Sequence, residues 1–431
     1  MSSTKKTIAE GAQSAIARKL LAYARGGDPD VQLPKMLKAV DALVPKDYLV
    51  EQRALFHEVI DNPDNNWMVL LKSLWADIDP GVLQKVLENF LVNASLVGLR
   101  RQDAAAAEHG CNVPWALLVD PTSACNLHCT GCWAAEYGDR LNLTFEELDS
   151  IVEQGKELGV FFYLFSGGEP LVRKRDVIRL CEKHDDCAFT AFTNATLIDD
   201  ALAEDMLRVR NFIPAISVEG FEEATDARRG AGTYAAVVRA MDVLRRHRLP
   251  FGVSCCYTHA NAASIGSEAF VDDLVARGAK FAWFFTYMPV GASAPTDLLA
   301  TAEDRAFMYR QIRAFRETKP IFTMDFWNDG EFTQGCIAGG RRYLHINAQG
   351  DVDPCVFAHY SNMNIHDHTL LECLQSPLFM AYHDNQPFNE NLLLPCPILD
   401  NIGRIAEMVD ESGAHSTDLQ APEDAHALAE K

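Results

Sequence analysis

Residues 125–132 read Cys125-Asn126-Leu127-His128-Cys129-Thr130-Gly131-Cys132 and follow a short apolar run, so three cysteines stand at positions i, i+4 and i+7. Twelve cysteines in 431 residues predict about 0.01 occurrences of this spacing by chance, which makes a functional origin the better explanation. Three thiolates on one short loop can hold three corners of a cubane iron–sulfur cluster and leave the fourth iron open to another molecule. The stretch therefore predicts an iron–sulfur site with one open iron.

A zinc site is the alternative interpretation of these cysteines, but structural zinc usually has four ligands in two separated pairs. The spacing resembles the CxxxCxxC signature of the radical SAM superfamily. In that family the open iron is chelated by the amino and carboxylate groups of S-adenosylmethionine (SAM). Reduction of the 4Fe–4S cluster then cleaves SAM to a 5′-deoxyadenosyl radical, which abstracts a hydrogen atom. The resemblance implies that Cys125, Cys129 and Cys132 hold this cluster.

The composition describes an ordinary soluble protein of two or three domains, with 48% hydrophobic and 23% charged residues. A formal net charge of −21 disfavours a nucleic-acid partner, because polyphosphates are repelled. No apolar stretch has the length needed to span a bilayer, and the N-terminus lacks the apolar region of a signal peptide. We therefore expect a cytoplasmic protein, in which thiols stay reduced and clustered cysteines are metal ligands rather than disulfides.

Residues 1–112 form a region that we predict to be helical. Its clearest pattern is an apolar face with the helical spacing i, i+3, i+4, i+7 and i+8, made by Leu83, Val86, Leu87, Phe90 and Leu91. One interpretation of the region is a cap packed on the catalytic domain. The alternative is a platform for an apolar substrate or a membrane surface, which would place the protein in peripheral contact with a membrane.

Residues 113–328 alternate short apolar runs with amphipathic segments. Strands are predicted at residues 115–120, 160–165, 188–193, 212–218, 251–258 and 281–287. Thr144 and Glu147 make a capping box for the helix after the cysteine loop. Repeated strand–helix units predict an α/β fold with a parallel sheet. Six units suit the open partial (β/α)6 barrel that the family resemblance implies, with function at the C-terminal edge of the strands.

Polar residues at successive strand ends carry the rest of the resemblance, which covers residues 114–291. Ser166-Gly167-Gly168-Glu169-Pro170 resembles the GGEP motif, which contacts the methionyl amino group of SAM in the family. Ala195 stands where the family often has the glycine of Thr-Asn-Gly. Arg228 is an alternative to Arg229 as a contact on the SAM side. The cofactor-binding residues that the resemblance implies are Gly167, Gly168, Glu169, Asn194, Ser217, Glu219 and Arg229.

Residues 329–405 resemble the start of a SPASM or twitch extension, which holds auxiliary iron–sulfur clusters. Cys336 precedes Gly350 and Cys355 with the matching spacing, and residues 343–346 and 352–356 predict a hairpin that brings the two cysteines together. A full SPASM region has seven cysteines, whereas only Cys373 and Cys396 follow here. We therefore predict a small C-terminal iron–sulfur domain with one auxiliary 4Fe–4S cluster on Cys336, Cys355 and Cys396. Its fourth ligand is Asp400, a histidine or no protein group.

The remaining cysteines are interpreted as structural. Cysteine packs as a small hydrophobe in buried strands and helices. This interpretation covers Cys111, Cys181, Cys187, Cys255, Cys256 and Cys373. Residues 406–431 are expected to form a short helix and a frayed acidic tail.

The sequence as a whole indicates a radical SAM enzyme, an oxidoreductase or bond-forming catalyst of anaerobic metabolism. The preferred substrate is an apolar small molecule or lipid, from which the radical abstracts hydrogen; the alternative is a peptide- or protein-modifying maturase of the SPASM type. A reductase such as a ferredoxin or flavodoxin is the expected electron donor. A non-enzymatic electron-transfer or cluster-carrier protein is the third reading, but it would need none of the SAM-contacting strand ends.

Overall fold

The computed structural model describes residues 27–43, 50–290 and 294–419. Residues 1–26 and 420–431, which belong to the predicted helical region and tail, lie outside the described residues. The described chain is built around one nine-stranded sheet with the strand order β7-β6-β5-β4-β3-β2-β1-β8-β9. Its strands are β1 (Ala116–Val119), β2 (Phe162–Phe165), β3 (Ala188–Thr193), β4 (Phe212–Ser217), β5 (Gly252–Tyr257), β6 (Phe281–Thr286), β7 (Phe322–Asp325), β8 (Tyr343–Ile346) and β9 (Val352–Asp353).

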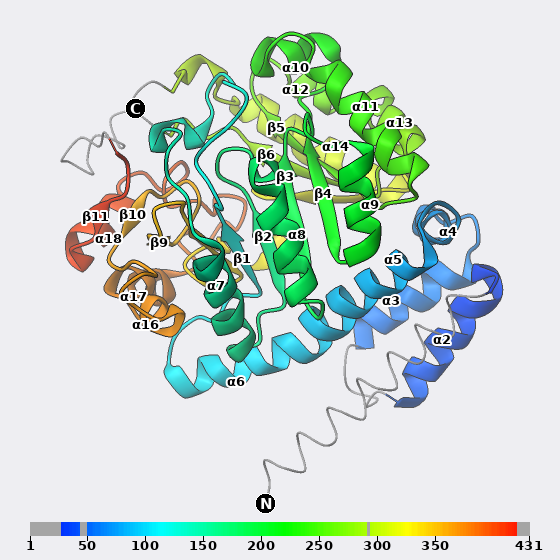
Figure 1. Ribbon diagram of the computed structural model, residues 1–431, viewed down its shortest axis with the longest axis horizontal. Coiled ribbons are helices and arrows are strands. Elements are labelled where there is room, and N and C mark those ends of the chain that lie inside the picture. Colours follow the sequence, from blue (N-terminus) through cyan, green and yellow to red (C-terminus); the bar gives the residue numbers. More distant parts are fainter. Residues whose placement is uncertain (1–26, 44–49, 291–293, 420–431) are drawn as a thin grey trace, which may run out of the picture.

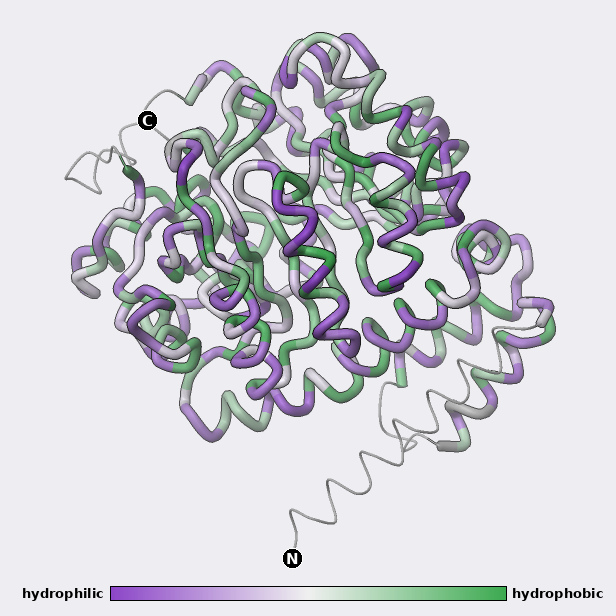
Figure 2. The backbone as a smooth tube through the Cα atoms, viewed as in Figure 1, coloured by the Kyte–Doolittle hydropathy of each residue, from purple (hydrophilic) through white to green (hydrophobic). Residues whose placement is uncertain are grey.

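The six predicted strands are all present and run parallel, which confirms the α/β partial barrel. The predicted capping box is also present, with the Glu147 amide donating to the Thr144 hydroxyl at 3.2 Å. The prediction missed β7, which pairs with β6 and follows the long helix at residues 302–318. Figure 1 shows the connecting helices covering the outside of the sheet, and Figure 2 shows hydrophilic and hydrophobic residues alternating along them.

Helices connect the strands of the barrel, as the repeated strand–helix units predicted. In the barrel they are η2 (Trp133–Tyr137), α7 (Phe145–Glu157), η3 (Pro170–Arg173), α8 (Lys174–Lys183), α9 (Asp200–Val209), α10 (Glu222–Arg229), α11 (Thr233–Arg246), α12 (Ala262–Ile265), α13 (Glu268–Arg277), η4 (Thr296–Leu298) and α14 (Ala302–Thr318). Those of the C-terminal region are α15 (Gly330–Thr333), α16 (Leu370–Leu374), α17 (Pro377–Asn385) and α18 (Arg404–Ser412). Among the described residues, none of the helices combines the length and apolar character needed to cross a bilayer.

The described part of the N-terminal region is helical and packs on the barrel. It consists of α2 (Pro29–Leu43), α3 (Val50–Asp61), α4 (Asn66–Asp77), α5 (Pro80–Leu87), the π-helix η1 (Glu88–Gly98) and α6 (Leu99–His109). The stretch from α5 to α6 crosses one end of the sheet (Figure 1). In η1 the Asn89 amide donates to the Cys187 carbonyl at 2.7 Å, and the Phe90 ring packs edge-on against Trp115 and Phe162. The helices therefore cover the end of the barrel where β1 and β2 begin.

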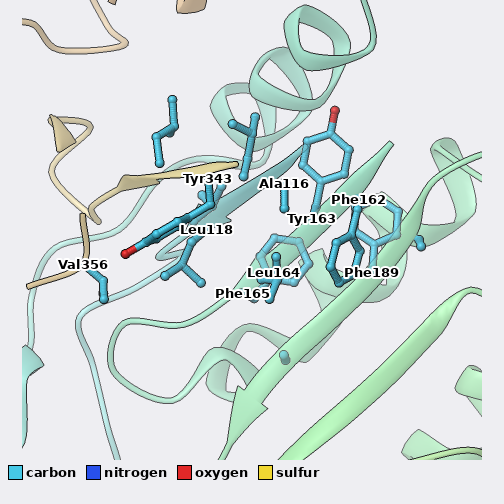
Figure 3. Close-up of a cluster of buried hydrophobic side chains, with 14 of the residues drawn as sticks. Ala116, Leu118, Phe162, Tyr163, Leu164, Phe165, Phe189, Tyr343 and Val356 are labelled. Atoms are coloured by element: carbon cyan, nitrogen blue, oxygen red, sulfur yellow. The ribbon is translucent and has the colours of Figure 1, made fainter. Parts of the chain in front are cut away.

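The C-terminal region is joined directly to the barrel sheet. The predicted hairpin exists, because β8 and β9 pair antiparallel with His345 opposite Asp353. Its strand β8 also pairs parallel with β1, with Tyr343 opposite Ala116. Figure 3 shows Tyr343 and Val356 gathered with side chains of β1 and β2 in one buried cluster.

The boundary predicted before residue 406 falls inside a packed helix. Helix α18 begins at Arg404, and its Ile405, Met408 and Val409 side chains are buried in the main core. Beyond it, β11 (His415–Ser416) pairs antiparallel with β10 (Tyr360–Ser361). Residues 406–418 therefore belong to the folded body. The sequence did not reveal this packing, because a short amphipathic helix does not identify its partner.

A buried histidine ties β1, β8 and β9 together. His345 on β8 is fully buried, with its Nε2 2.9 Å from the Asp120 carboxylate and its Nδ1 3.1 Å from the Asp353 carboxylate. Burial alone would lower the pKa of His345, but the two carboxylates outweigh it and raise the pKa to about 10. Burial raises the pKa of Asp353 to about 6, so above that pH Asp353 faces the imidazolium as a carboxylate.

This arrangement predicts a loss of stability at alkaline pH. Because the pKa of His345 is higher in the folded than in the unfolded chain, its contribution is complete below about pH 6.5 and is lost as the pH rises through about 10. The free energy of unfolding, measured with urea, should therefore fall between pH 7 and pH 10 in the wild type. We expect His345→Gln to remove this part of the fall. His383→Gln, at an exposed histidine beside Asp384, is the control. An equal fall of the unfolding free energy in the wild type and in His345→Gln would contradict the stabilising role of His345.

Candidate functional site

A cavity of about 250 Å³ occupies the barrel interior and reaches the C-terminal ends of the strands. All three cysteines of the 125–132 loop line it, together with the glycine turn after β2 and residues at the ends of β3 to β6. Of the predicted site residues, those on the cavity wall are Cys125, Cys129, Cys132, Gly167, Gly168, Glu169, Asn194, Ser217 and Arg229. The structure thus brings together residues that are more than one hundred positions apart in the sequence.

The cysteine loop presents its sulfurs next to polar donors. The Asn194 side-chain amide lies 4.0 Å from the Cys125 sulfur, and an Arg229 guanidinium nitrogen lies 4.0 Å from the Cys129 sulfur. Burial raises the pKa of both thiols, so binding of a cluster must displace their protons. Gly131 has φ +65°, and a Cβ there would lie 2.7 Å from the Tyr287 ring, so this position requires glycine.

In the described part of the chain, no three His, Cys, Asp or Glu side chains are arranged to hold a single metal ion. A cubane cluster does not require such an arrangement, because each thiolate binds a different iron. Three cysteines on one loop, with an open cavity beside them, are the donor set that a 4Fe–4S cluster with one free iron would use.

The glycine turn after β2 packs on the backbone that leads into the cysteine loop. The amides of Gly168 and Glu169 donate to the carbonyls of Thr122 and Ala124, both at 2.9 Å. A Cβ on Gly168 would lie 2.1 Å from the Ala124 carbonyl oxygen, so a larger residue would push the turn away from the loop. The turn can therefore reach the cavity only with glycine at this position.

Glu169 extends from this turn and is only 1% exposed. Its carboxylate accepts hydrogen bonds from the Leu171 amide at 3.0 Å, the Thr193 hydroxyl at 2.7 Å and the Asn194 amide at 2.7 Å. Burial raises its pKa, although these donors oppose the shift. The carboxylate is therefore fixed between the ends of β2 and β3.

The end of β3 carries a left-handed backbone conformation at Ala195, where the sequence departs from the Thr-Asn-Gly pattern. Ala195 is buried and has φ +60°, a left-handed conformation that residues other than glycine rarely adopt. Its neighbour Asn194 donates from its side chain to the Asn126 side-chain oxygen at 2.9 Å. The chain thus keeps the backbone shape that a glycine would provide, and uses it to hold Asn194 against the cysteine loop.

Glu219 lies behind the cavity wall rather than on it. It is fully buried and accepts from Arg228 at 2.7 Å, from Arg229 at 2.8 Å and from the Cys256 amide at 3.2 Å. Burial opposes its ionisation, but the two guanidinium groups hold its pKa below the ordinary value. Both arginines line the cavity. The sequence left open whether Arg228 or Arg229 is the contact on the SAM side, and the Glu219 carboxylate positions both.

Removal of this carboxylate is expected to destabilise the fold strongly. Glu219→Gln would leave two arginines with side chains only 13% and 14% exposed without a counter-charge. Breaking one partner of a buried ion pair costs about 3–5 kcal/mol of unfolding free energy. Chemical denaturation can measure the loss, with Glu223→Gln at an exposed position of α10 as the control. A loss equal to that of the control would show that water screens these arginines.

Cys256, which was predicted to be structural, lies on the cavity wall. Cys256 and Ser254 line the cavity, whereas the alternate residues Val253 and Cys255 are fully buried on the other side of β5. The two-residue period of a strand places adjacent cysteines on opposite faces, but the sequence does not show which face is inward. Cys181, Cys187 and Cys255 are buried, as the structural interpretation requires.

The three predicted auxiliary cysteines line a second, small cavity of about 30 Å³. Burial raises the pKa of Cys336 to about 12 and that of Cys355 to about 11, and the Tyr343 hydroxyl lies 2.8 Å from the Cys355 sulfur. The Tyr382 hydroxyl is buried at this cavity and has no hydrogen-bond partner among the described residues. Three thiols around one buried space fit a sulfur-ligated cluster, whereas Cys373 lies in α16 away from the cavity wall.

Asp400, a candidate for the fourth auxiliary ligand, is already engaged. Its two oxygens accept from Arg305 at 2.6 Å, from the Trp327 indole at 3.2 Å and from the Cys396 amide at 3.1 Å. The side chain is only 4% exposed. In this arrangement Asp400 positions the loop that carries Cys396, and the two remaining alternatives for a fourth ligand stay open.

Comparison with known proteins supports the interpretation of the central region. Residues 119–260 match the model of the Radical SAM superfamily. A serine-type anaerobic sulfatase-maturating enzyme of Klebsiella aerogenes is 28% identical over 222 residues, which cover 46% of this chain and 53% of that enzyme. Mycofactocin maturase MftC of Mycolicibacterium smegmatis is 27% identical over 271 residues, which cover 58% of this chain and 66% of the maturase. The chain thus spans between half and two thirds of the length of these relatives.

A solved structure shows the same fold. Streptococcus suis SuiB, in its crystal structure bound to precursor peptide SuiA, superimposes with a TM-score of 0.58 and 17% identity. The superposition covers 70% of this chain and 76% of SuiB.

Proposed function

We propose that this chain, whose residues 119–260 form a domain of the radical SAM superfamily, is an enzyme that reductively cleaves SAM and abstracts a hydrogen atom from a substrate. One observation carries the proposal: Cys125, Cys129 and Cys132 line the same cavity as the Gly167–Glu169 turn. When bound, a 4Fe–4S cluster and SAM would supply the 5′-deoxyadenosyl radical.

The residues of the chain have separable tasks in this proposal. The three cysteines hold the cluster, and the nearby Asn194 and Arg229 donors lower the cost of its negative charge. An ionised carboxylate has about four lone-pair sites, and Glu169 uses three, so it keeps room for one ammonium donor of SAM. Arg228 and Arg229 are the cations available to a SAM carboxylate or ribose on the opposite side.

The cavity wall favours an apolar group near the reacting position. Away from the cysteine loop its lining is mainly aromatic, and Phe192, Trp283 and Phe285 contact one another there. The other aromatic residues of the wall are Trp115, Trp133, Phe162, Phe326, Tyr343, Phe357 and Tyr287. Such a wall excludes water from a radical and binds hydrocarbon or aromatic surface.

Two substrate classes present such a group, and the comparisons favour the peptide. The two curated relatives described above are maturases, which supports a peptide or protein with an apolar side chain in the cavity. An apolar small molecule or lipid, the preferred reading of the sequence, has the aromatic wall in its favour but no support from these relatives. We therefore place the peptide first. A ferredoxin or flavodoxin remains the proposed electron donor, and a cytoplasmic location remains a prediction.

The reaction class can be tested without the natural substrate. Anaerobically reconstituted protein with dithionite should convert SAM to methionine and 5′-deoxyadenosine. Peptides with perdeuterated leucine and perdeuterated dodecanoate, added in separate reactions, then test the substrate class. Deuterium transferred to 5′-deoxyadenosine from the peptide only would support the peptide, whereas transfer from dodecanoate only would support the lipid. Absence of 5′-deoxyadenosine in all reactions would contradict the proposed function.

A further inference from the structure

The inward face of β5 places a thiol inside the candidate active site. Ser254 and Cys256 are its two residues on the cavity wall, and Cys256 is the one nearer the C-terminal end of the strand, where the cysteine loop lies. Phe285 of β6 is its register partner and lines the same cavity. The neighbouring thiol, Cys255, is fully buried on the other side of the strand.

The surroundings of Cys256 connect it to the cysteine loop. Its amide donates to Glu219, and its thiol is hydrogen-bonded by Arg228, the residue that also interacts electrostatically with Cys129 and Cys132. Arg228 in addition donates to the Thr130 carbonyl at 3.3 Å, so it bridges the thiol and the loop. Burial raises the pKa of Cys256 to about 11, so the sulfur carries its hydrogen at neutral pH.

A second residue indicates that a ligand occupies this part of the cavity. Tyr287 is 1% exposed and lines the cavity, and its hydroxyl has no hydrogen-bond partner among the described residues. The hydroxyl lies against Gly131 of the cysteine loop, and the Arg228 guanidinium lies 5.9 Å from the centre of its ring. An unpaired buried hydroxyl is costly, so a polar ligand atom beside Tyr287 would satisfy it. A ligand bound there would lie between the loop and the residues around Cys256.

We propose that Cys256 is a hydrogen-atom donor to carbon radicals formed in this cavity. The inference rests on the proposed function. The S–H bond of a thiol is weaker than an alkyl C–H bond, so hydrogen passes from sulfur to a carbon radical spontaneously. The S–H bond breaks, a C–H bond forms on the radical carbon, and a thiyl radical remains on Cys256. One electron from the low-potential reductant that also drives SAM cleavage, together with one proton from solvent, restores the thiol.

The experiment uses the reconstituted full-length protein, SAM and dithionite in deuterated water, without substrate. The thiol of Cys256 exchanges to S–D, so a 5′-deoxyadenosyl radical that is quenched there yields 5′-deoxyadenosine with one deuterium. Mass spectrometry of the nucleoside measures this label. Solvent itself does not supply deuterium, because O–D bonds are too strong to react with the radical.

Two variants make the result specific. Cys256→Ser keeps an exchangeable deuteron but replaces the weak S–D bond with a strong O–D bond, so the 5′-deoxyadenosine that it forms should lose the label. Cys255→Ala removes the adjacent thiol on the other face of β5 and should keep the wild-type label. Unlabelled wild-type product, or an equal label in Cys256→Ser, would overturn the proposal. So would complete loss of 5′-deoxyadenosine in both Cys256→Ser and Cys256→Ala, because the residue would then be structural. No 5′-deoxyadenosine from wild type would instead refute the proposed function itself.

Discussion

Replacement of Cys125, Cys129 and Cys132 together with alanine is expected to abolish the formation of 5′-deoxyadenosine from SAM. The three sulfurs line one cavity and are the only protein ligands that we propose for the first cluster. Without them the cluster has no anchor, and SAM has no open iron to bind. The assay is anaerobic reconstitution with dithionite, followed by quantification of methionine and 5′-deoxyadenosine and of iron per chain.

The variant should remain folded, because Cys125 is exposed and the other two cysteines are half-buried on a surface loop. Circular dichroism can verify this. Its matched control is alanine at the three auxiliary cysteines, which removes the same number of thiols elsewhere in the chain. Undiminished 5′-deoxyadenosine in the Cys125, Cys129 and Cys132 variant would refute the assignment of the loop.

The second large effect concerns iron content. If Cys336, Cys355 and Cys396 hold an auxiliary cluster, the reconstituted protein should contain about eight irons per chain, and alanine at all three positions should lower this to about four. The physical reason is that the three thiols surround one buried space in which burial holds them protonated unless a metal replaces the protons.

Cys373→Ala is the control for this experiment. Cys373 is fully buried but lies in α16, away from the small cavity, so iron content should stay near the wild-type value. Stoichiometric zinc with only about four irons in the wild-type protein would reject the auxiliary cluster. The assignment of the first cluster would be unaffected by that result.

The sequence predicted local structure well and pairing partners poorly. Six strands were found because each is a short apolar run between helices, a pattern that depends only on neighbouring residues. The strand β7 was missed because its residues alternate between buried and more exposed positions and do not form a continuous apolar run. The hairpin of β8 and β9 was predicted from its turn, but the pairing of β8 with β1 was not, since the edge that a strand joins depends on residues far away in the chain.

In the candidate site, too, local features were predicted and contacts between distant segments were not. The cysteine loop and the glycine turn were predicted because their chemistry is written in consecutive residues. Glu219 was identified as a site residue, but its position behind Arg228 and Arg229 depends on how α10 packs against β4. Cys256 was assigned to the core because a pair of cysteines in a strand does not reveal which of them faces the barrel interior. Asp400 was considered as a ligand because its hydrogen bonds to Arg305 and Trp327 are not visible in the sequence.

The pairing of β1 with β8 also sets an order of events during synthesis. Asp120 and His345, which join the ends of these strands, are separated by 225 residues. At about 5–20 residues per second, the ribosome needs roughly 10–45 s to produce β8 after β1 has emerged. During that interval one edge of β1 has no strand partner, and such an edge is a template for association with other chains. A nascent chain of this protein therefore keeps one edge of β1 open until β8 has been made.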